Sequence, residues 1–184
     1  MRIISGTARG TKLYTLEGLE TRPTLDRVKE SIFNIIQGQI QDSTVLDLFS
    51  GSGAIGIEML SRGAKKAVLC DKAKPAIDII NKNLEKTHLK EKAEVYNLDF
   101  EKCLEKIKTQ KFDLIYIDPP YDTDYIIISL EIILKEKLTS KDCIIILETD
   151  DEDRILEQIK NIDVKIIDKR KYGRASIIFL NCLD

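Results

Sequence analysis

Hydrophobic and polar positions along this chain predict a regular succession of β-strands and α-helices. Short runs rich in Ile, Leu and Val are typical of strands buried on both faces, and apolar residues at three- and four-residue spacing are typical of helices. The predicted strands are 44–48, 66–70, 93–97, 112–117, 143–147, 164–169 and 175–181, and the predicted helices are 54–62, 75–87, 101–108, 124–137 and 152–160. This alternation requires a mostly parallel sheet covered by helices on both faces.

The last two predicted strands are an exception to the parallel arrangement. Their connection, around Tyr172 and Gly173, is too short for a parallel crossover, so they must form an antiparallel hairpin. The sequence therefore predicts an α/β fold with a mostly parallel, seven-stranded sheet that ends in an antiparallel hairpin.

The first forty residues have a different pattern. Residues 2–5 and 11–16 alternate around two glycines and predict a short β-hairpin. A helix follows, with Thr24 as its expected N-terminal cap and Gly38 as its expected end. We interpret residues 1–40 as an N-terminal extension and residues 41–184 as the main domain, packed together as one compact unit.

Composition narrows the class of protein. The chain has 184 residues, of which 43% are hydrophobic and 33% charged, as in a globular domain. Its four cysteines lie far apart and it has one histidine, His88, so neither a zinc finger nor a disulfide framework is expected. No segment approaches the roughly 18 apolar residues of a membrane span, and no signal peptide is visible. We expect a reduced, cytoplasmic, monomeric protein without a metal ion.

Charge is distributed unevenly although the formal net charge is only −2. Residues 1–29 carry six basic against three acidic side chains, and residues 163–174 carry five against two, so the middle of the chain is acidic. Two basic segments can present a polyanion-binding face, and the alternative is a solvated surface of mixed charge. The candidates for nucleic-acid contact are Arg2, Arg9, Lys12, Arg170, Lys171 and Arg174.

A glycine turn predicts a nucleoside cofactor. Residues 47–53, Asp-Leu-Phe-Ser-Gly-Ser-Gly, follow the first parallel strand and open a helix. Gly51 and Gly53 let the backbone approach a ligand, and Asp71 at the end of the next strand can accept hydrogen bonds from ribose hydroxyls. The alternative is a tight turn that merely needs glycine.

Two cofactor classes compete for this turn. NAD(P) would place its pyrophosphate on the helix N-terminus. S-adenosylmethionine has an ammonium group instead, for which Asp47 supplies a carboxylate. Asp99 and Phe100, after the third strand, can contact an adenine, although Asp99 can equally cap the helix that follows.

The fourth strand ends in a rigid corner, Asp118-Pro119-Pro120-Tyr121. Two prolines stiffen the turn, which fixes the Asp118 carboxylate and a backbone carbonyl as two acceptors for an exocyclic –NH2 group. Tyr121 can stack on the base. Because the fourth strand lies beside the first in a doubly wound sheet, this corner should face the glycine turn across one crevice.

With these motifs the sequence resembles the class I S-adenosylmethionine-dependent methyltransferases, whose fold is Rossmann-like, and specifically the bacterial 16S rRNA guanine-N2 methyltransferase family (RsmD-like). The matching residues extend over nearly the whole chain: Met1–Gly6 with Arg9-Gly10, Thr21–Thr24 with Asp26–Val28, Asp47–Gly53, Asp118–Tyr121 and Tyr172-Gly173. The ribose-binding position, often Glu in relatives, is Asp71 here.

The resemblance implies methyl transfer to N2 of a guanine in 16S rRNA, on a partly or fully assembled small ribosomal subunit, with S-adenosylhomocysteine as the second product. Residues 1–40 would face the RNA. The methionine part would be held by Asp47, Phe49, Ser50, Gly51, Ser52 and Gly53, and Arg22 and Thr24 would lie near the cofactor or the target.

Three other hypotheses stay open at this point. A DNA adenine-N6 or cytosine-N4 methyltransferase would share the Asp118–Tyr121 corner, but 184 residues leave no room for a large sequence-reading region. An NAD-dependent oxidoreductase would explain the glycine turn and leave the corner unexplained. A non-enzymatic RNA-binding module would explain only the basic segments.

Overall fold

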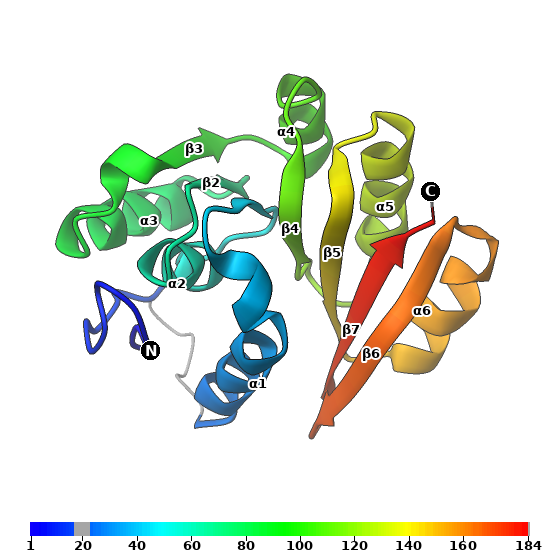
Figure 1. Cartoon of the computed structure of the whole chain (residues 1–184), viewed down its shortest axis with the longest axis horizontal. Coiled ribbons are helices and arrows are strands. Elements are labelled where there is room, and N and C mark those ends of the chain that lie inside the picture. Colours follow the sequence, from blue (N-terminus) through cyan, green and yellow to red (C-terminus); the bar gives the residue numbers. More distant parts are fainter. Residues whose placement is uncertain (17–22, 184) are drawn as a thin grey trace.

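The computed structural model describes residues 1–16 and 23–183, and a seven-stranded sheet forms its centre (Figure 1). The strands are β1 (Thr44–Asp47), β2 (Lys66–Asp71), β3 (Ala93–Asn97), β4 (Phe112–Ile117), β5 (Thr139–Thr149), β6 (Val164–Tyr172) and β7 (Ala175–Cys182). The helices are α1 (Pro23–Ile40), α2 (Ala54–Ser61), α3 (Lys74–Lys86), α4 (Phe100–Lys106), α5 (Tyr125–Lys135) and α6 (Glu152–Gln158), with 3-10 turns at Lys90–Lys92 and Ile159–Asn161.

The order of the strands in the sheet is β3-β2-β1-β4-β5-β7-β6. Strands β1 to β5 pair in parallel, and β7 is antiparallel to both β5 and β6. The predicted parallel sheet with a terminal antiparallel hairpin is therefore confirmed. The chain reverses its direction of strand addition between β1 and β4, which is where a ligand crevice opens in such sheets.

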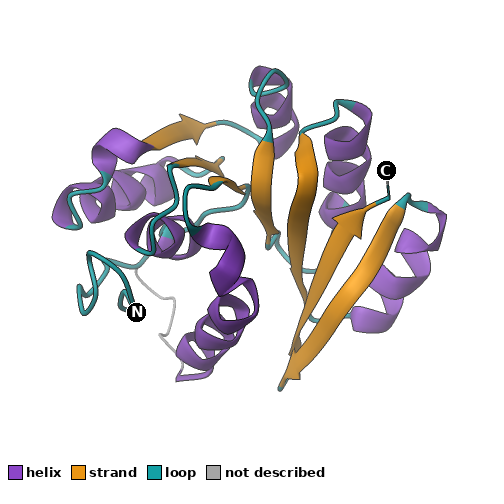
Figure 2. Cartoon of the chain, viewed as in Figure 1, coloured by secondary structure: helices purple, strands orange, loops and turns teal. Residues whose placement is uncertain are grey.

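Helices cover both faces of the sheet (Figure 2). The helices α1, α2 and α3 contribute to the apolar core on one face, together with β-strand residues such as Leu114 and Ile146. The helices α4, α5 and α6 contribute to the core on the other face, with Ile115 and Ile145. This alternation along β4 and β5 is what strands buried on both faces require.

The N-terminal β-hairpin is shorter than predicted. It consists of one antiparallel bridge between Arg2 and Lys12, with Ile3 N–H donating to the Thr11 carbonyl at 2.9 Å and Leu13 N–H to the Met1 carbonyl at 3.0 Å, and the pairing does not extend beyond Ile3. The N–H groups of Ile4 and Ser5 donate to the buried carboxylate of Glu58 on α2, at 2.8 and 3.0 Å. The segment is thus anchored to a helix and does not form a two-stranded ladder.

Gly6 allows this segment to approach α2 closely. Its φ is +85°, and a Cβ atom there would lie 1.8 Å from the carbonyl oxygen of Ser61. Thr7 N–H donates to the same carbonyl at 2.8 Å, so any side chain at position 6 would displace the contact.

Helix α1 is longer than its predicted extent. It begins at Pro23, so Thr24 lies in its first turn, and it continues through Gly38 to Ile40. Both Ile36 and Ile40 are buried, so packing of their side chains outweighs the low helix propensity of glycine.

Glu58 is the anchor for the N-terminal segment, since it also pairs with Lys29 at 3.3 Å and Arg62 at 2.8 Å. Glu58→Ala should lower the free energy of unfolding by about 3 kcal/mol, because it leaves buried donors and cations unpaired. Urea denaturation measures the loss, and limited proteolysis should cut residues 1–16 first. The exposed control Glu105→Ala should change stability by less than about 0.5 kcal/mol; equal stability of the two variants would contradict the anchoring role.

Candidate active site

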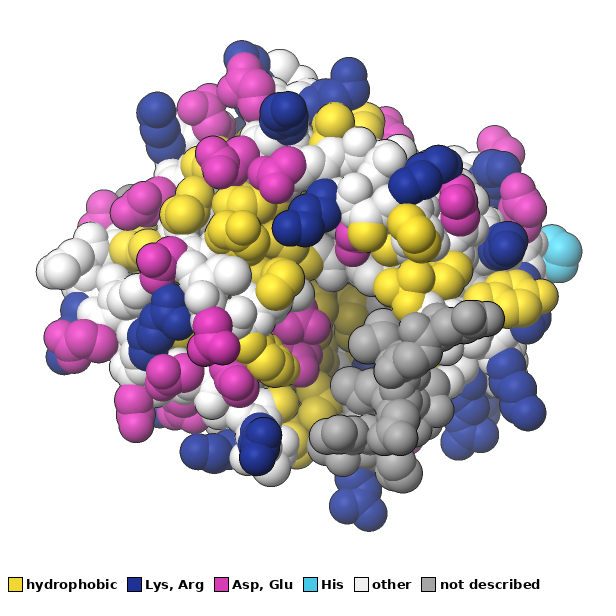
Figure 3. Space-filling model, turned by 180° about the vertical axis from the view of Figure 1, so that it is seen from behind, with side chains coloured by type: hydrophobic (Ala, Val, Ile, Leu, Met, Phe, Trp, Pro, Cys, Tyr) yellow, Lys and Arg dark blue, Asp and Glu magenta, His cyan; other side chains and the backbone are white. Residues whose placement is uncertain are grey.

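Two adjoining cavities lie at the carboxyl edge of the parallel strands. The larger, of about 400 Å³, and the smaller, of about 200 Å³, share Phe49, Gly51 and Asp118. The glycine turn and the Asp118–Tyr121 corner therefore face one hollow, as predicted. The space-filling view from behind shows hydrophobic side chains around a central hollow and Lys and Arg side chains along the lower edge (Figure 3).

The glycine turn has a rigid, left-handed geometry, with φ of +54° at Gly51 and +77° at Gly53. Ser50 Oγ donates to the Asp47 carbonyl at 2.6 Å and accepts from Cys70 N–H at 3.0 Å, so it braces the turn against β2. Gly53 lines neither cavity, and a Cβ there would meet Leu69 at 3.1 Å. Its role is close packing, whereas Gly51 and Ser52 reach cavity walls.

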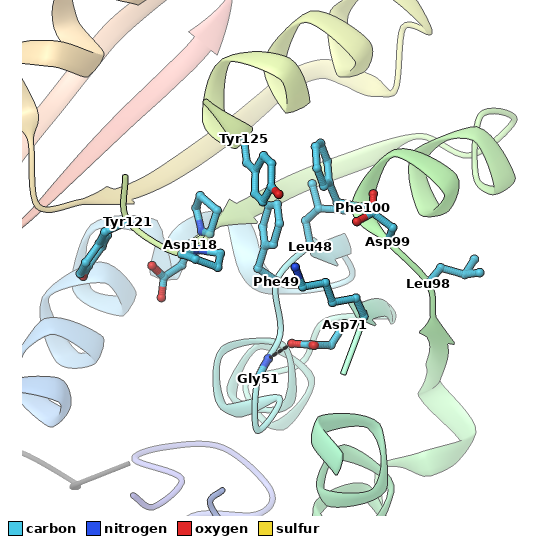
Figure 4. Close-up of a pocket in the computed structure, with 13 residues that line it drawn as sticks. Leu48, Phe49, Gly51, Asp71, Leu98, Asp99, Phe100, Asp118, Tyr121 and Tyr125 are labelled. Carbon is cyan, nitrogen blue, oxygen red and sulfur yellow. Dashed lines mark hydrogen bonds between the residues drawn. The ribbon is translucent and has the colours of Figure 1, made fainter. Parts of the chain in front are cut away.

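Asp71 stands at the wall of the larger cavity, at the end of β2 (Figure 4). Its two carboxylate oxygens accept from the N–H groups of Gly51, at 2.9 Å, and Ala73, at 2.8 Å. Each oxygen keeps a further lone pair for a ligand hydroxyl. The side chain is thus held at the cavity wall with acceptor capacity left for a ligand.

An aromatic cluster forms the opposite wall of the larger cavity. Phe49 and Phe100 lie 5.3 Å apart between ring centroids, and Phe100 and Tyr125 lie 4.8 Å apart. Asp99 caps α4 through Glu101 N–H, at 3.2 Å, and also lines this cavity, so both of its predicted roles are compatible with the geometry. The flat apolar wall beside an acceptor suits a purine ring.

Some lining residues were not predicted from the sequence. Leu48, Lys72, Leu98 and Tyr125 also line the larger cavity. Tyr125 begins α5 four residues after Tyr121, and that short spacing after the rigid corner is the one sequence signal that could have identified it.

Three carboxylates line the smaller cavity, and one of them, Asp118, also lines the larger. Asp47 ends β1, Asp118 follows β4, and Glu148 lies near the end of β5. Among the described residues none of the three forms a salt bridge. Burial raises the pKa of Asp47 to about 7. Burial and the charges of Glu148 and Asp47 hold the pKa of Asp118 well above its usual range.

Asp47 keeps an unsatisfied hydrogen-bond capacity. Its Oδ2 accepts from Gly56 N–H at 3.0 Å, whereas Oδ1 is buried and has no partner. A buried carboxylate oxygen without a donor is costly, so this atom is suited to receive a donor from a ligand.

The predicted nucleic-acid contacts lie on two exposed segments. The N-terminal segment and the tip of the β6–β7 hairpin are both on the lower side of the sheet, with α1 between them (Figure 1). Arg2, Arg9 and Lys12 are exposed on the first, and Arg170, Lys171 and Arg174 on the second. Arg170 is paired with Asp168 at 2.9 Å.

The remaining predictions concern Arg22, Thr24, metal ions and membranes. Arg22 lies outside the described residues, and Thr24 lies in the first turn of α1. Within residues 1–16 and 23–183 no cluster of three or more potential metal ligands is arranged around a common point. No helix in that part of the chain is both long and apolar enough to cross a membrane.

Known proteins resemble this chain over nearly its full length. The sequence model of the family described as "Conserved hypothetical protein 95" matches residues 1–181. YlbH of Bacillus subtilis is 36% identical over 179 residues, 96% of each chain. Ribosomal RNA small subunit methyltransferase D of Haemophilus influenzae is 36% identical over 152 residues, 82% of this chain and 79% of that protein. The structure of yhhF from Escherichia coli matches with a TM-score of 0.84 at 28% identity, covering 99% of this chain and 97% of that one.

The raised pKa of Asp47, about 7, makes stability depend on pH. Between about pH 4 and 7 the folded state keeps a proton that the unfolded state has released, so stability is lost as pH rises through this window. Asp47→Asn should reduce the fall in the free energy of unfolding between pH 5 and 7.5 by about 2–3 kcal/mol. The control Asp142→Asn, at an exposed position of β5, should follow the unsubstituted protein. Parallel curves for all three proteins would show that Asp47 is not the group responsible.

Proposed function

This chain belongs to the family described as "Conserved hypothetical protein 95", and on that premise we propose that it methylates ribosomal RNA with S-adenosylmethionine as methyl donor. The target we propose is N2 of a guanine in 16S rRNA, within a partly or fully assembled small subunit. The relatives support rRNA as the substrate class, since one of them is a ribosomal RNA small subunit methyltransferase. The single structural observation in favour is that Asp118 borders both cavities of the hollow.

The residues present fit S-adenosylmethionine. Asp71 offers fixed acceptors for ribose hydroxyls, and the wall made by Phe49, Phe100 and Tyr125 suits adenine. The orphaned Oδ1 of Asp47 lines the smaller cavity and would receive the ammonium group. A positive charge beside Asp47 would lower its pKa and restore its ionised form. When bound, the cofactor supplies a methyl group activated by sulfonium and leaves as S-adenosylhomocysteine.

The corner after β4 would orient the attacking amine. Pro119 has no N–H to donate, so the turn presents acceptors, namely the Asp118 carboxylate and backbone carbonyls. Hydrogen bonds to both N–H groups of an exocyclic amine favour the pyramidal form, in which the nitrogen lone pair is available. Because its pKa is raised, Asp118 is also a better acceptor for the proton that the amine releases. Tyr121 is 46% exposed at the rim, where it can stack on the base.

A tritium assay tests the proposal against the DNA-methyltransferase alternative, which shares the same corner. Tritiated methyl groups from S-adenosylmethionine should be transferred to small ribosomal subunits or 16S rRNA, and nuclease digestion should release labelled N2-methylguanosine. Label in duplex DNA alone, or in N6-methyladenosine, would overturn the proposal.

Asp118→Ala should lower kcat by at least about 10³-fold, because it removes an acceptor that acts on the reacting amine. Affinity for S-adenosylhomocysteine, measured by calorimetry, should stay within about threefold, since the other cofactor-binding residues are intact. A parallel loss of cofactor affinity would contradict the assigned role and make Asp118 a binding residue.

Reversal of charge at Arg9 and Lys12 should weaken binding to small subunits and reduce the slope of log K against log salt by about 2. The matched control reverses Lys108 and Lys135, which follow α4 and end α5 at the opposite edge of the sheet. Filter binding over a salt series measures the affinity and the slope for each variant. If affinity and slope match those of the control, the N-terminal segment is only scaffolding.

A further inference from the structure

Glu148 has no role in the reaction as described so far, yet it lies beside the reacting corner. In the β4–β5 pairing Ile117 is opposite Leu147, so the next positions, Asp118 and Glu148, are neighbours at the ends of adjacent strands. Their side chains leave the same face of the sheet as that of Tyr116, because alternate residues of a strand share a face. The charge of Glu148 accordingly acts on both Asp118 and Tyr116.

The carboxylate of Glu148 is held by one hydrogen bond and has capacity for more. Its Oε2 accepts from the hydroxyl of Tyr116. The residue is 7% exposed and lines the smaller cavity of about 200 Å³, and also a minor hollow beside Pro119 and Asp151. Among the hydrogen bonds of the described part of the chain, only Oε2 has a partner, so Oε1 keeps acceptor capacity for a ligand.

The lining of this cavity combines apolar and acceptor groups beside the glycine turn. Met1 and the α1 residues Val28 and Ile32 are apolar, and Asp118 and Glu148 are acceptors. Lys29 also lines this cavity, and its Nζ lies 3.3 Å from Glu58 and donates to the Arg2 carbonyl at 3.1 Å. A ring that presents two adjacent donors on one edge would satisfy these acceptors.

We propose that Glu148 selects guanine as the target base, by accepting a hydrogen bond from N1–H while Asp118 accepts from the adjacent N2 amine. This inference rests on the proposed function and adds the residue that discriminates among bases. Guanine alone among the four bases carries an imino N–H next to its exocyclic amine. Adenine and cytosine have a ring nitrogen lone pair at that place, which would face the Glu148 carboxylate unpaired.

Such an arrangement discriminates strongly because the penalty applies to a buried acceptor. A site built to receive a donor rejects an analogue without it by orders of magnitude, whereas shape alone gives far less. Burial raises the pKa of Glu148, and the hydrogen bond from the Tyr116 hydroxyl opposes that shift by favouring the ionised form, which accepts most strongly. Glu148 is thus a specificity residue and Tyr116 its positioning residue.

The experiment compares guanine with 2-aminopurine, which keeps the 2-amino group but has a lone pair at N1. Once the labelled nucleotide is mapped, either base is placed at that position in 16S rRNA assembled into small subunits. We expect the unsubstituted protein to prefer guanine by at least about 100-fold in kcat/KM. In Glu148→Met, of similar length but without an acceptor, activity on guanine should fall about 100-fold and the preference should narrow to less than tenfold.

Two further variants keep the result interpretable. Glu148→Gln retains size and a hydrogen bond to Tyr116, and should lose about tenfold on guanine as a neutral acceptor. Glu157→Gln, on the exposed side of α6, should behave as the unsubstituted protein. Affinity for S-adenosylhomocysteine should stay within about threefold in every variant, which shows that the fold is intact.

The outcomes separate this inference from the proposed function. If guanine N2 is methylated and Glu148→Met keeps full preference over 2-aminopurine, the assignment of Glu148 is overturned while the proposed function stands. If the unsubstituted protein labels adenine N6 or cytosine N4, the proposed function fails and the assignment fails with it, because neither target carries an imino N–H beside its amine.

Discussion

The parallel register of β1, β4 and β5 imposes the central constraint of this structure, since it brings Asp47, Asp118 and Glu148 to one buried place. Burial removes these carboxylates from water and raises the pKa of each of them, and at Asp118 the charges of Glu148 and Asp47 raise it further. Burial of these three carboxylates therefore costs the folded chain free energy, and a ligand rich in positive charge and hydrogen-bond donors would relieve that cost. An ammonium, a sulfonium and the donor edge of a base are groups of that kind.

The two faces of the sheet supply different walls of the hollow. The aromatic wall of Phe100 and Tyr125 comes from α4 and α5 on one face, whereas Val28 and Ile32 come from α1 on the other. Asp118 borders both cavities because it follows the carboxyl end of β4, at the edge of the sheet where both cavities open. The N-terminal extension is therefore part of the active hollow and not an appendage to it, and its attachment through Glu58 links the stability of residues 1–16 to the shape of the smaller cavity.

The fold and half of the site could be predicted from the sequence because their signals are local. Asp47–Gly53 and Asp118–Tyr121 are contiguous motifs, and the resemblance they indicated is confirmed by the family match and by the relatives. Glu148 and Tyr125 were missed because their importance depends on strand order and helix packing, which no single segment encodes. The N-terminal hairpin is shorter than predicted for a related reason: alternation predicted a strand through Ser5, but a buried carboxylate on α2 accepts from the N–H groups of Ile4 and Ser5.

The same charge pattern explains how a chain of net charge −2 can act on a polyanion. Acidic groups inside the hollow would repel phosphate and can accept hydrogen bonds from base edges, whereas the exposed basic groups of the N-terminal segment and the β6–β7 tip would attract phosphate. We infer that this separation sets the orientation of the nucleotide, with its backbone held at the N-terminal segment and the β6–β7 tip and its base directed inward. Uniform positive charge would bind RNA more tightly but would favour phosphate at the reacting corner, so a low net charge serves selectivity at the expense of affinity.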